Sequence, residues 1–109
     1  SIGDYSWIGD DVVLYSLGEI EIGKNVVISQ KSYICTASHD YLQSDFPIFA
    51  KKNTIEDECW LATDVFVSPG ITIGEGSVIG SRSSVYKDIP SNKVCVGSPA
   101  KIIRERIRE

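Results

Sequence analysis

The sequence predicts an all-β protein that winds as a parallel β-helix of hexapeptide repeats, and three observations lead to this prediction. An isoleucine, leucine or valine recurs at every sixth residue along most of the chain. The residue after it is often small, and another apolar or small residue often stands four positions on. An amphipathic helix would repeat its apolar residues at three and four, and a half-buried strand at two, so a strict period of six fits neither alone. A short strand followed by a tight turn does fit, and stacking such units buries aligned aliphatic side chains.

The repeat occupies three registers along the chain. A shift of two residues at 19–21 separates the first register from the second, and a long interruption separates the second from the third. The repeating aliphatic positions are Ile2, Ile8, Leu14 and Ile20, then Ile22, Ile28 and Ile34, and then Ile55, Leu61, Val67, Ile73, Ile79 and Val85. Three hexapeptides make one triangular coil, so residues 1–97 are expected to form about four coils. The glycines of the repeats are expected at turns that require a positive φ.

A single elongated domain is expected over residues 1–109. Of the 109 residues 42% are hydrophobic, which is enough to bury a core. The chain has no methionine and begins in register at Ser1, so we expect an N-terminal part of the domain to precede it. No segment approaches the roughly 18 apolar residues of a membrane span, and no secretory signal is visible. A formal net charge of −4 argues against general nucleic-acid binding.

The cysteines predict neither a metal site nor a disulfide framework. They form no CxxC pattern, are odd in number and accompany a single histidine, so a zinc site lacks ligands and no metal is expected. Cys59 stands at the inward position of a repeat and Cys95 lies between two valines, so both are expected to pack in the core. Cys35 could be a nucleophile beside His39, although reactive thiols need a specific electropositive site. Reduced, buried thiols indicate a cytoplasmic protein.

The longest interruption of the repeat is the first candidate for a functional element. Ile34 and Ile55 are twenty-one residues apart where six would keep the rhythm, so residues 40–54 are expected to leave the coil as a loop. Loops of this length are uncommon and are often functional. The segment carries apolar residues that are costly to leave in water: Tyr41, Phe46, Pro47 and Phe49. We therefore expect the loop to pack on a neighbouring molecule.

The only histidine, His39, directly precedes this loop. A lone histidine is most often a plain polar or structural residue, because acid–base chemistry needs a positioned partner. Rigid scaffolds, however, usually carry their catalytic groups on loops. The position of His39 at the junction of coil and loop therefore favours a catalytic base.

The C-terminal segment is expected to form a short α-helix over residues 98–109. Residues 94–97 are predicted as a last strand, after which Ser98 can serve as N-cap and Pro99 as the first helical residue. Isoleucines of the helix would dock on the coils. Four of the eleven basic residues stand beside them: Lys101, Arg104, Arg106 and Arg108. They are interpreted either as a solvated helix face or as a site for a phosphate-bearing ligand.

Five segments give the chain a resemblance to a known family. They are residues 22–28 (IGKNVVI), 35–41 (CTASHDY), 60–62 (WLA), 67–74 (VSPGITIG) and 96–101 (VGSPAK). The chain resembles the hexapeptide-repeat acetyltransferases, most closely the colanic-acid-type exopolysaccharide O-acetyltransferases, which are related to the maltose and galactoside acetyltransferases. The resemblance covers nearly the whole chain. It implies a left-handed parallel β-helix, although right-handed crossovers are the general rule. It also implies a homotrimer with acetyl-CoA bound between neighbouring subunits.

The resemblance further implies roles for individual residues. His39 matches the family's catalytic histidine, which would take the proton of a sugar hydroxyl as that oxygen attacks the thioester carbon. Asp40 is interpreted either as a residue that positions this ring or merely as the start of the loop. A main-chain N–H near Ala62 could hold the oxyanion. The candidates for binding the acceptor are Tyr15, Ser16 and Asp40. The candidates for binding acetyl-CoA are Trp60, Ala62, Ser81, Arg82, Lys87, Lys101 and Arg104. Trp60 is interpreted either as a neighbour of the pantetheine arm or as an aromatic side chain packed at a corner.

Two positions depart from the family pattern. Ser16 stands where relatives tend to carry an asparagine that contacts the acceptor, and Tyr86 stands where several carry threonine. The short Ser16 side chain would reach less far. Acceptor binding is therefore more in question than acetyl-CoA binding.

The sequence thus predicts a homotrimeric, cytoplasmic enzyme that moves the acetyl group of acetyl-CoA directly to a saccharide hydroxyl in exopolysaccharide biosynthesis. The nearest alternative is an N-acetyltransferase acting on an amino sugar, a sugar nucleotide or a serine-like acceptor. A zinc carbonic anhydrase on the same scaffold would need three histidines. A non-enzymatic structural solenoid should show a regular threonine array and no long loop. The threonines of this chain form no such array: Thr36, Thr54, Thr63 and Thr72.

Overall fold

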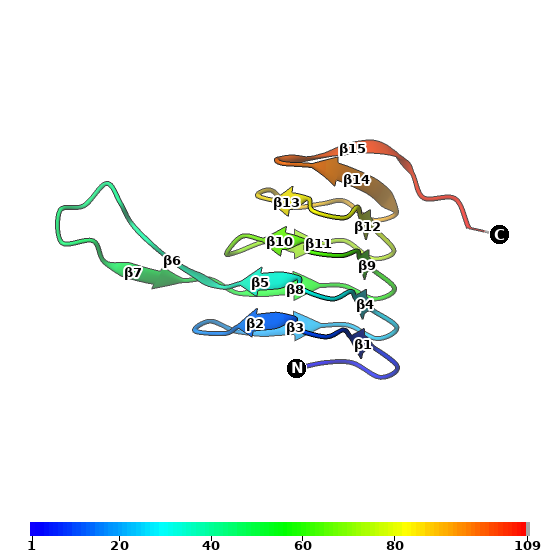
Figure 1. Cartoon of the computed structure of the whole chain (residues 1–109), viewed down its shortest axis with the longest axis horizontal. Coiled ribbons are helices and arrows are strands. Elements are labelled where there is room, and N and C mark those ends of the chain that lie inside the picture. Colours follow the sequence, from blue (N-terminus) through cyan, green and yellow to red (C-terminus); the bar gives the residue numbers. More distant parts are fainter. Residues whose placement is uncertain (109) are drawn as a thin grey trace.

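The computed structural model describes residues 1–108, which form a stack of flat coils with a long hairpin projecting from one side (Figure 1). All regular secondary structure in this part of the chain is β. The strands are β1 Trp7–Ile8, β2 Val13–Tyr15, β3 Ile20–Ile22, β4 Val27–Ile28, β5 Tyr33–Cys35, β6 Ala37–His39, β7 Ile48–Ala50, β8 Asn53–Ile55, β9 Trp60–Leu61, β10 Phe66–Val67, β11 Thr72–Ile73, β12 Val78–Ile79, β13 Ser84–Val85, β14 Lys93–Gly97 and β15 Ala100–Glu105.

Equivalent strands of successive coils pair and build three sheets along the stack. The first sheet runs β1, β4, β9, β12, β14 and β15, the second runs β2, β5, β10 and β13, and the third runs β3, β8 and β11. The pairs within these sheets are parallel, apart from the antiparallel pair of β14 and β15. The predicted parallel β-helix is therefore confirmed for the described residues.

The aliphatic residues of the repeat form three columns inside the coils. The columns are Ile8, Ile28, Leu61, Ile79 and Cys95 in the first sheet, Leu14, Ile34, Val67 and Val85 in the second, and Ile2, Ile22, Ile55, Ile73 and Ile89 in the third. Ile28, Ile34 and Leu61 expose 0% of their surface. Each aliphatic side chain buried in this way stabilises the fold by about 1.5–3 kcal/mol. These columns form the hydrophobic core.

The glycines of the repeat do not play the role that the sequence predicts for most of them. Positive φ occurs at the third residue after an inward aliphatic, and residues such as Asn25 and Asp64 adopt it in most coils. Gly74 is needed for a different reason, because a Cβ on it would lie 2.6 Å from the nitrogen of Ser91 and 2.7 Å from the carbonyl carbon of Pro90. The small residue after the aliphatic thus permits the close approach of the next coil.

Serine side chains complete the hydrogen bonding at the corners of the coils. The Ser32 hydroxyl donates to the carbonyl of Ala62 at 3.0 Å and accepts the N–H of Val65 at 3.1 Å. Ser6 and Ser77 bridge their own neighbouring coils in the same way. Among residues 1–108, no buried side-chain nitrogen or oxygen lacks a hydrogen-bond partner. Because each serine bridges two coils, it helps to fix their register.

The excursion predicted from the break in the repeat is a two-stranded hairpin, residues 37–50, which we call the arm. Its strands β6 and β7 pair antiparallel. The predicted bounds of 40–54 are wrong, because the chain leaves the coil at Ala37 and is back in the third sheet at β8, Asn53–Ile55. His39 therefore lies on the arm and not at a corner of a coil.

Asn53 explains why the chain rejoins the coil earlier than predicted. Its buried side chain donates to the carbonyl of Cys35 at 2.7 Å and accepts the N–H of Ile71 at 3.0 Å. Because the Asn53 side chain forms hydrogen bonds with main-chain groups of two coils, it holds the base of the arm closed. The aliphatic pattern could not reveal this, since an asparagine occupies the inward position.

The helix predicted over residues 98–109 is wrong. Residues 100–105 form β15, which folds back on β14 after a turn at Ser98 and Pro99, with Gly97 at a φ of 107°. A serine followed by proline is compatible with a tight turn as well as with a helix start. By pairing with β14, β15 also provides partners for backbone groups that would be unpaired on an edge strand. The isoleucines of this segment do not dock as expected, since Ile102 is half exposed. Glu109 lies outside the described residues.

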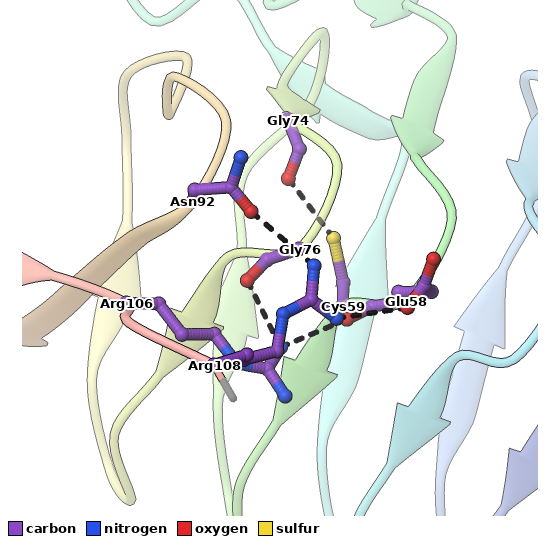
Figure 2. A network of polar contacts seen from close by, with 7 residues as sticks. All are labelled: Glu58, Cys59, Gly74, Gly76, Asn92, Arg106 and Arg108. Carbon is purple, nitrogen blue, oxygen red and sulfur yellow. Dashed lines mark hydrogen bonds and ion pairs between the residues drawn. The ribbon is translucent and has the colours of Figure 1, made fainter.

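Arg106 and Arg108 fasten the end of the chain to three coils (Figure 2). The Arg106 guanidinium donates to the main-chain oxygens of Glu58, at 3.0 Å, and Gly76, at 2.9 Å, and its backbone N–H donates to the oxygen of Asn92 at 2.8 Å. Arg108 pairs with the Glu58 carboxylate at 2.8 Å. The three partners all have positive φ and occupy the same corner in successive coils. The two arginines therefore connect the coils along one edge.

Replacing Gly74 by alanine is expected to destabilise the stack. The new Cβ would overlap main-chain atoms of the next coil, and overpacking of this kind costs about 1–3 kcal/mol. Ser68→Ala is the matched control, because Ser68 holds the same repeat position and already has a Cβ. Denaturant unfolding should give a lower midpoint for Gly74→Ala and an unchanged one for Ser68→Ala. Equal midpoints for the unchanged protein, Gly74→Ala and Ser68→Ala would show that the coils tolerate a side chain at position 74.

Candidate active site

His39 lies on β6 of the arm with an exposed side chain. Its Nδ1 is 3.1 Å from the carbonyl oxygen of Phe46, at the far end of the arm's tip. A carbonyl can only accept a hydrogen bond, so Nδ1 carries the hydrogen and Nε2 keeps a free lone pair. The imidazole also stacks on the Phe46 ring, with centroids 4.3 Å apart and planes at 11°. The arm thus presents a histidine whose outer nitrogen can accept a proton.

Asp40 organises the tip of the arm. Its carboxylate accepts the N–H of Leu42 at 3.1 Å and the side-chain amide of Gln43 at 3.0 Å, while its own N–H donates to the oxygen of Pro47 at 2.8 Å. Of the two interpretations that the sequence left open, the structure favours a role in the loop. Within residues 1–108 the carboxylate forms no hydrogen bond or ion pair with the imidazole.

Trp60 lies on the outer face of the first sheet and is held in place without being buried. Its indole Nε1 donates to the Ser29 hydroxyl of the preceding coil at 3.0 Å, and 46% of the residue remains exposed. A fixed and exposed ring offers a surface to a ligand. The alternative of an aromatic side chain packed into a corner does not describe it.

The pairing register places several of the residues expected to bind acetyl-CoA along the first sheet. Trp60 pairs with Val78, Val78 with Val94, and Val94 with Arg104. Lys101 pairs with Val96 in the same pair of strands, β14 and β15. Three strand-to-strand steps cover about 14 Å at ordinary spacing. We give the name donor row to the three residues of the first sheet that are candidates for binding acetyl-CoA, the acetyl donor: Trp60, Lys101 and Arg104.

The main chain at the adjacent corner offers hydrogen-bond donors, although not from Ala62. The N–H of Ala62 donates to the oxygen of Ile79 at 2.9 Å, so this group is occupied by the coil itself. Within residues 1–108, no hydrogen bond is formed by the N–H groups of Thr63 and Ser81, which follow one step later at this corner. The free donors therefore come from Thr63 and Ser81.

The other two basic candidates differ in their positions. Arg82 follows Ser81 at the same corner, is exposed and has a positive φ of 60°. Lys87 stands two residues after Val85, at the other side of the second sheet. Within one copy the structure brings Arg82 to the donor row but not Lys87.

Two of the three candidates for binding the acceptor, Tyr15 and Ser16, lie in the first coil, whereas Asp40 lies on the arm. Tyr15 ends β2, and its carbonyl accepts the hydroxyl of Thr36 at 2.6 Å, directly before the arm begins. Ser16 is exposed and lines a hollow of about 450 Å³ together with Leu14 and Gly18. Tyr15, Ser16 and the base of the arm share one corner of the stack, between the second and third sheets.

The residues expected to bind the acceptor and those expected to bind acetyl-CoA thus occupy different parts of the molecule. Figure 1 shows the arm projecting from one side of the stack and the column of β1, β4, β9 and β12 on the other. The second sheet separates them and bears an aromatic stripe on its outer face. The ring centroids of this stripe are 6.2, 6.2 and 6.0 Å apart in the order Tyr15, Tyr33, Phe66 and Tyr86. A single copy does not bring His39 to the donor row.

The cysteines fit the packing roles predicted for them. Burial raises the pKa of the Cys59 thiol to about 11, and burial also raises the pKa of Cys95, so neither forms a thiolate readily. The Cys35 thiol donates to the oxygen of Ala37 at 3.0 Å. Nothing in this geometry makes Cys35 the nucleophile that the sequence left open.

Two main-chain groups beside the candidate residues were missed by the sequence reasoning. The Phe46 carbonyl orients His39, and the free N–H of Thr63 stands at the donor-side corner. Main-chain groups leave no pattern in side-chain identities. The only available signal for Phe46 was its place before Pro47 in an apolar loop.

The chain is similar to proteins that are named as acetyltransferases. It is 61% identical, over 98% of its length, to a protein of Escherichia coli (strain K12) named as a colanic acid biosynthesis acetyltransferase, WcaF, of which it spans 59%. A maltose O-acetyltransferase from Clostridium difficile has a TM-score of 0.93 and 33% identity, with coverage of 98% of this chain and 59% of that one. A hexapeptide-repeat acetyltransferase of Vibrio cholerae complexed with acetyl coenzyme A has a TM-score of 0.90 and 33% identity, covering 98% and 60%. No protein-family model matches the chain.

Across residues 1–108, no three side chains of histidine, cysteine, aspartate or glutamate cluster as they would around a metal ion. The same residues contain no helix long and apolar enough to cross a membrane.

Cys35 is expected to react with a thiol reagent before the two core cysteines. In the folded protein the raised pKa keeps Cys59 protonated up to about pH 11, whereas after unfolding it ionises near the ordinary value. An aromatic disulfide reagent should therefore modify one thiol quickly and the others only in denaturant. Cys35→Ser should abolish the fast phase. A fast phase that survives this substitution would show that a core cysteine is accessible.

Proposed function

The chain belongs to the hexapeptide-repeat acetyltransferases, and on this basis we propose that it transfers the acetyl group of acetyl-CoA to a hydroxyl of a saccharide. The observation that carries the proposal is the histidine on the arm, whose Nδ1 is engaged by a carbonyl and whose Nε2 is free. The 61% identity to a protein named for colanic acid biosynthesis favours an exopolysaccharide precursor as the acceptor.

His39 is the general base in this proposal. Its Nε2 takes the proton of the acceptor hydroxyl while that oxygen attacks the thioester carbon of acetyl-CoA. The C–S bond then breaks, and the imidazolium gives the proton to the departing thiolate, so no acyl-enzyme forms. General base catalysis of this kind contributes typically about 10²–10⁴-fold. The N–H groups of Thr63 and Ser81 are the donors proposed for the oxyanion and the pantetheine amides.

The donor row supplies a surface of suitable chemistry for acetyl-CoA. The exposed Trp60 ring offers apolar contact to the pantetheine arm. Lys101 and Arg104 lie on the edge strand β15, farther along the stack, where their cationic groups can pair with phosphate oxygens. Arg82 adds a positive charge at the corner beside Ser81. We assign Lys87 to the same ligand only when it comes from a neighbouring copy.

A neighbouring copy completes the site in this proposal, as a homotrimer with the left-handed winding of the family. Two observations support it. His39 and the donor row lie on opposite sides of the second sheet, so one copy alone leaves the site divided. The aromatic stripe and the arm also expose apolar surface, including Tyr41 at 80% and Leu42 at 83%. Such surface is typical of an interface between proteins.

The acceptor is proposed to bind at the corner formed by Tyr15 and Ser16. Ser16 lines a hollow there, which Ser1 and Ile2 also line. Asp40 is reassigned to the structure of the arm, since its carboxylate is engaged at the tip. A purely structural solenoid would require neither an oriented histidine nor an exposed tryptophan, so these residues favour an enzyme over that alternative.

The proposed location is the cytoplasm. Cys35, Cys59 and Cys95 are all free thiols, and reduced cysteines are typical of that compartment.

Replacing His39 is expected to abolish acetyl transfer while leaving assembly intact. His39→Asn keeps an amide that can donate to the Phe46 carbonyl but has no base, so turnover should fall by at least about 10²-fold. Release of free CoA thiol from acetyl-CoA in the presence of saccharide acceptors measures this, and size-exclusion chromatography checks assembly. Ser44→Ala, on the exposed tip, is the control and should keep full turnover. Undiminished turnover in His39→Asn would rule out the assigned base.

The basic residues at the C-terminus are expected to separate into two classes. Lys101→Ala and Arg104→Ala should each raise the KM for acetyl-CoA about tenfold, because a charge-assisted contact to phosphate is lost, and should leave the Tm unchanged. Arg106→Ala should lower the free energy of unfolding by about 1 kcal/mol, because two carbonyls lose their donor, with little effect on KM. A loss of stability in Lys101→Ala and Arg104→Ala, together with a raised KM in Arg106→Ala, would contradict the proposed site.

A further inference from the structure

We propose that Phe46 is a positioning residue for His39, which sets the tautomer and plane of the imidazole through a left-handed backbone and a stacked ring. This inference rests on the proposed function, since it concerns the same base. It goes further because it explains how an exposed arm can keep that base ready before any substrate binds.

A chain of hydrogen bonds runs through the tip of the arm to the imidazole. The Asp40 carboxylate accepts the side-chain amide of Gln43, the carbonyl of Gln43 accepts the N–H of Phe46 at 3.0 Å, and the carbonyl of Phe46 accepts the hydrogen on Nδ1 of His39. A second bond, from the N–H of Asp40 to the oxygen of Pro47, closes the tip at 2.8 Å. Every partner belongs to the arm. The orientation of the base therefore needs no contact with the coils.

Within this series of hydrogen bonds, the backbone conformation of Phe46 is unusual. Its φ is 52°, in the left-handed region that a bulky residue adopts at a cost of about 1–2 kcal/mol. The other residues with left-handed backbones are mainly at coil corners, where the repeat requires them, whereas this one lies at the tip of the arm. An outlier maintained by its surroundings is a recognised mark of a functional site. Here it turns the carbonyl of Phe46 back toward β6 and the imidazole.

The side chain of Phe46 adds a second constraint on the same ring. Its plane lies at 11° to the imidazole at a centroid distance of 4.3 Å, so it covers one face of His39. The carbonyl fixes which nitrogen carries the hydrogen, and the stacked ring limits rotation of the imidazole. Phe46 itself is half exposed, at 53%, so burial in a core does not account for its identity. Among residues 1–108, Nε2 has no hydrogen-bond partner.

The two constraints can be separated by substitution. Asparagine adopts the left-handed region readily, so Phe46→Asn should keep the carbonyl in place and lose only the stacked ring. Valine is β-branched and strongly disfavoured at positive φ, so Phe46→Val should lose both the carbonyl and the ring. Phe46→Tyr retains both and is the matched control.

Nitrogen-15 NMR of the uniformly labelled full chain gives a readout that does not depend on activity. The chain has a single histidine, so the imidazole signals belong to His39 alone. At about pH 8.5, where an imidazole is ordinarily neutral, the shifts of the two nitrogens show which one carries the hydrogen. The unchanged protein, Phe46→Tyr and Phe46→Asn should show hydrogen on Nδ1, and Phe46→Val should show a mixture or the other tautomer. Unaltered backbone signals from the coils confirm that each variant is folded.

Turnover of acetyl-CoA with a saccharide acceptor completes the test. Phe46→Val should lower kcat about tenfold with little change in the KM for acetyl-CoA, which corresponds to the loss of one hydrogen bond that orients the base. The kcat of Phe46→Asn should lie between that of Phe46→Val and that of the unchanged protein. Hydrogen on Nε2 in the unchanged protein, or a Phe46→Val variant with unaltered tautomer and kcat, would overturn the role of Phe46. A tautomer that shifts as expected in a protein that transfers no acetyl group would instead refute the proposed function and leave the positioning role intact.

Discussion

The structure depends on the parallel pairing of successive coils, in which equivalent hexapeptide positions lie side by side. Paired strands lie about 4.8 Å apart, so a side chain that points inward in one coil lies directly on its equivalent in the next. This constraint selects aliphatic side chains for the columns and small residues such as Gly74 where backbones approach. It also aligns every outward position. Trp60, Val78, Val94 and Arg104 form a straight row only because their strands keep this register.

The coils and the arm serve different parts of the proposed chemistry. The donor row lies on paired strands, which hold a long ligand along their axis. The arm leaves the coil at Ala37 and carries His39 outward, with its own hydrogen bonds fixing the imidazole. A base that is oriented within a self-contained hairpin can be presented to another molecule without loss of geometry. The division of the site between two sides of the second sheet is consistent with this arrangement.

The sequence revealed the periodic parts of the molecule and failed where main-chain geometry decides. All three columns follow from the aliphatic period, and the excursion beside His39 follows from its break. The bounds of the arm could not be predicted, because Asn53 occupies an inward position without being apolar. The C-terminal helix was wrong because Ser98 and Pro99 suit a hairpin turn equally well. The roles of Phe46 and Thr63 depend on backbone groups, which every residue type possesses.

A site shared between copies is the central claim, and complementation between two defective chains tests it most directly. Chains with His39→Asn retain the donor row, and chains with both Lys101→Ala and Arg104→Ala retain the base. The two are refolded together, and acetyl transfer is measured at acetyl-CoA concentrations far below the KM. Mixed assemblies should contain interfaces where an intact base meets an intact donor row, so the activity should exceed the sum of the two separate preparations. Activity equal to that sum would mean that base and donor row act within one copy, in contradiction to a shared site.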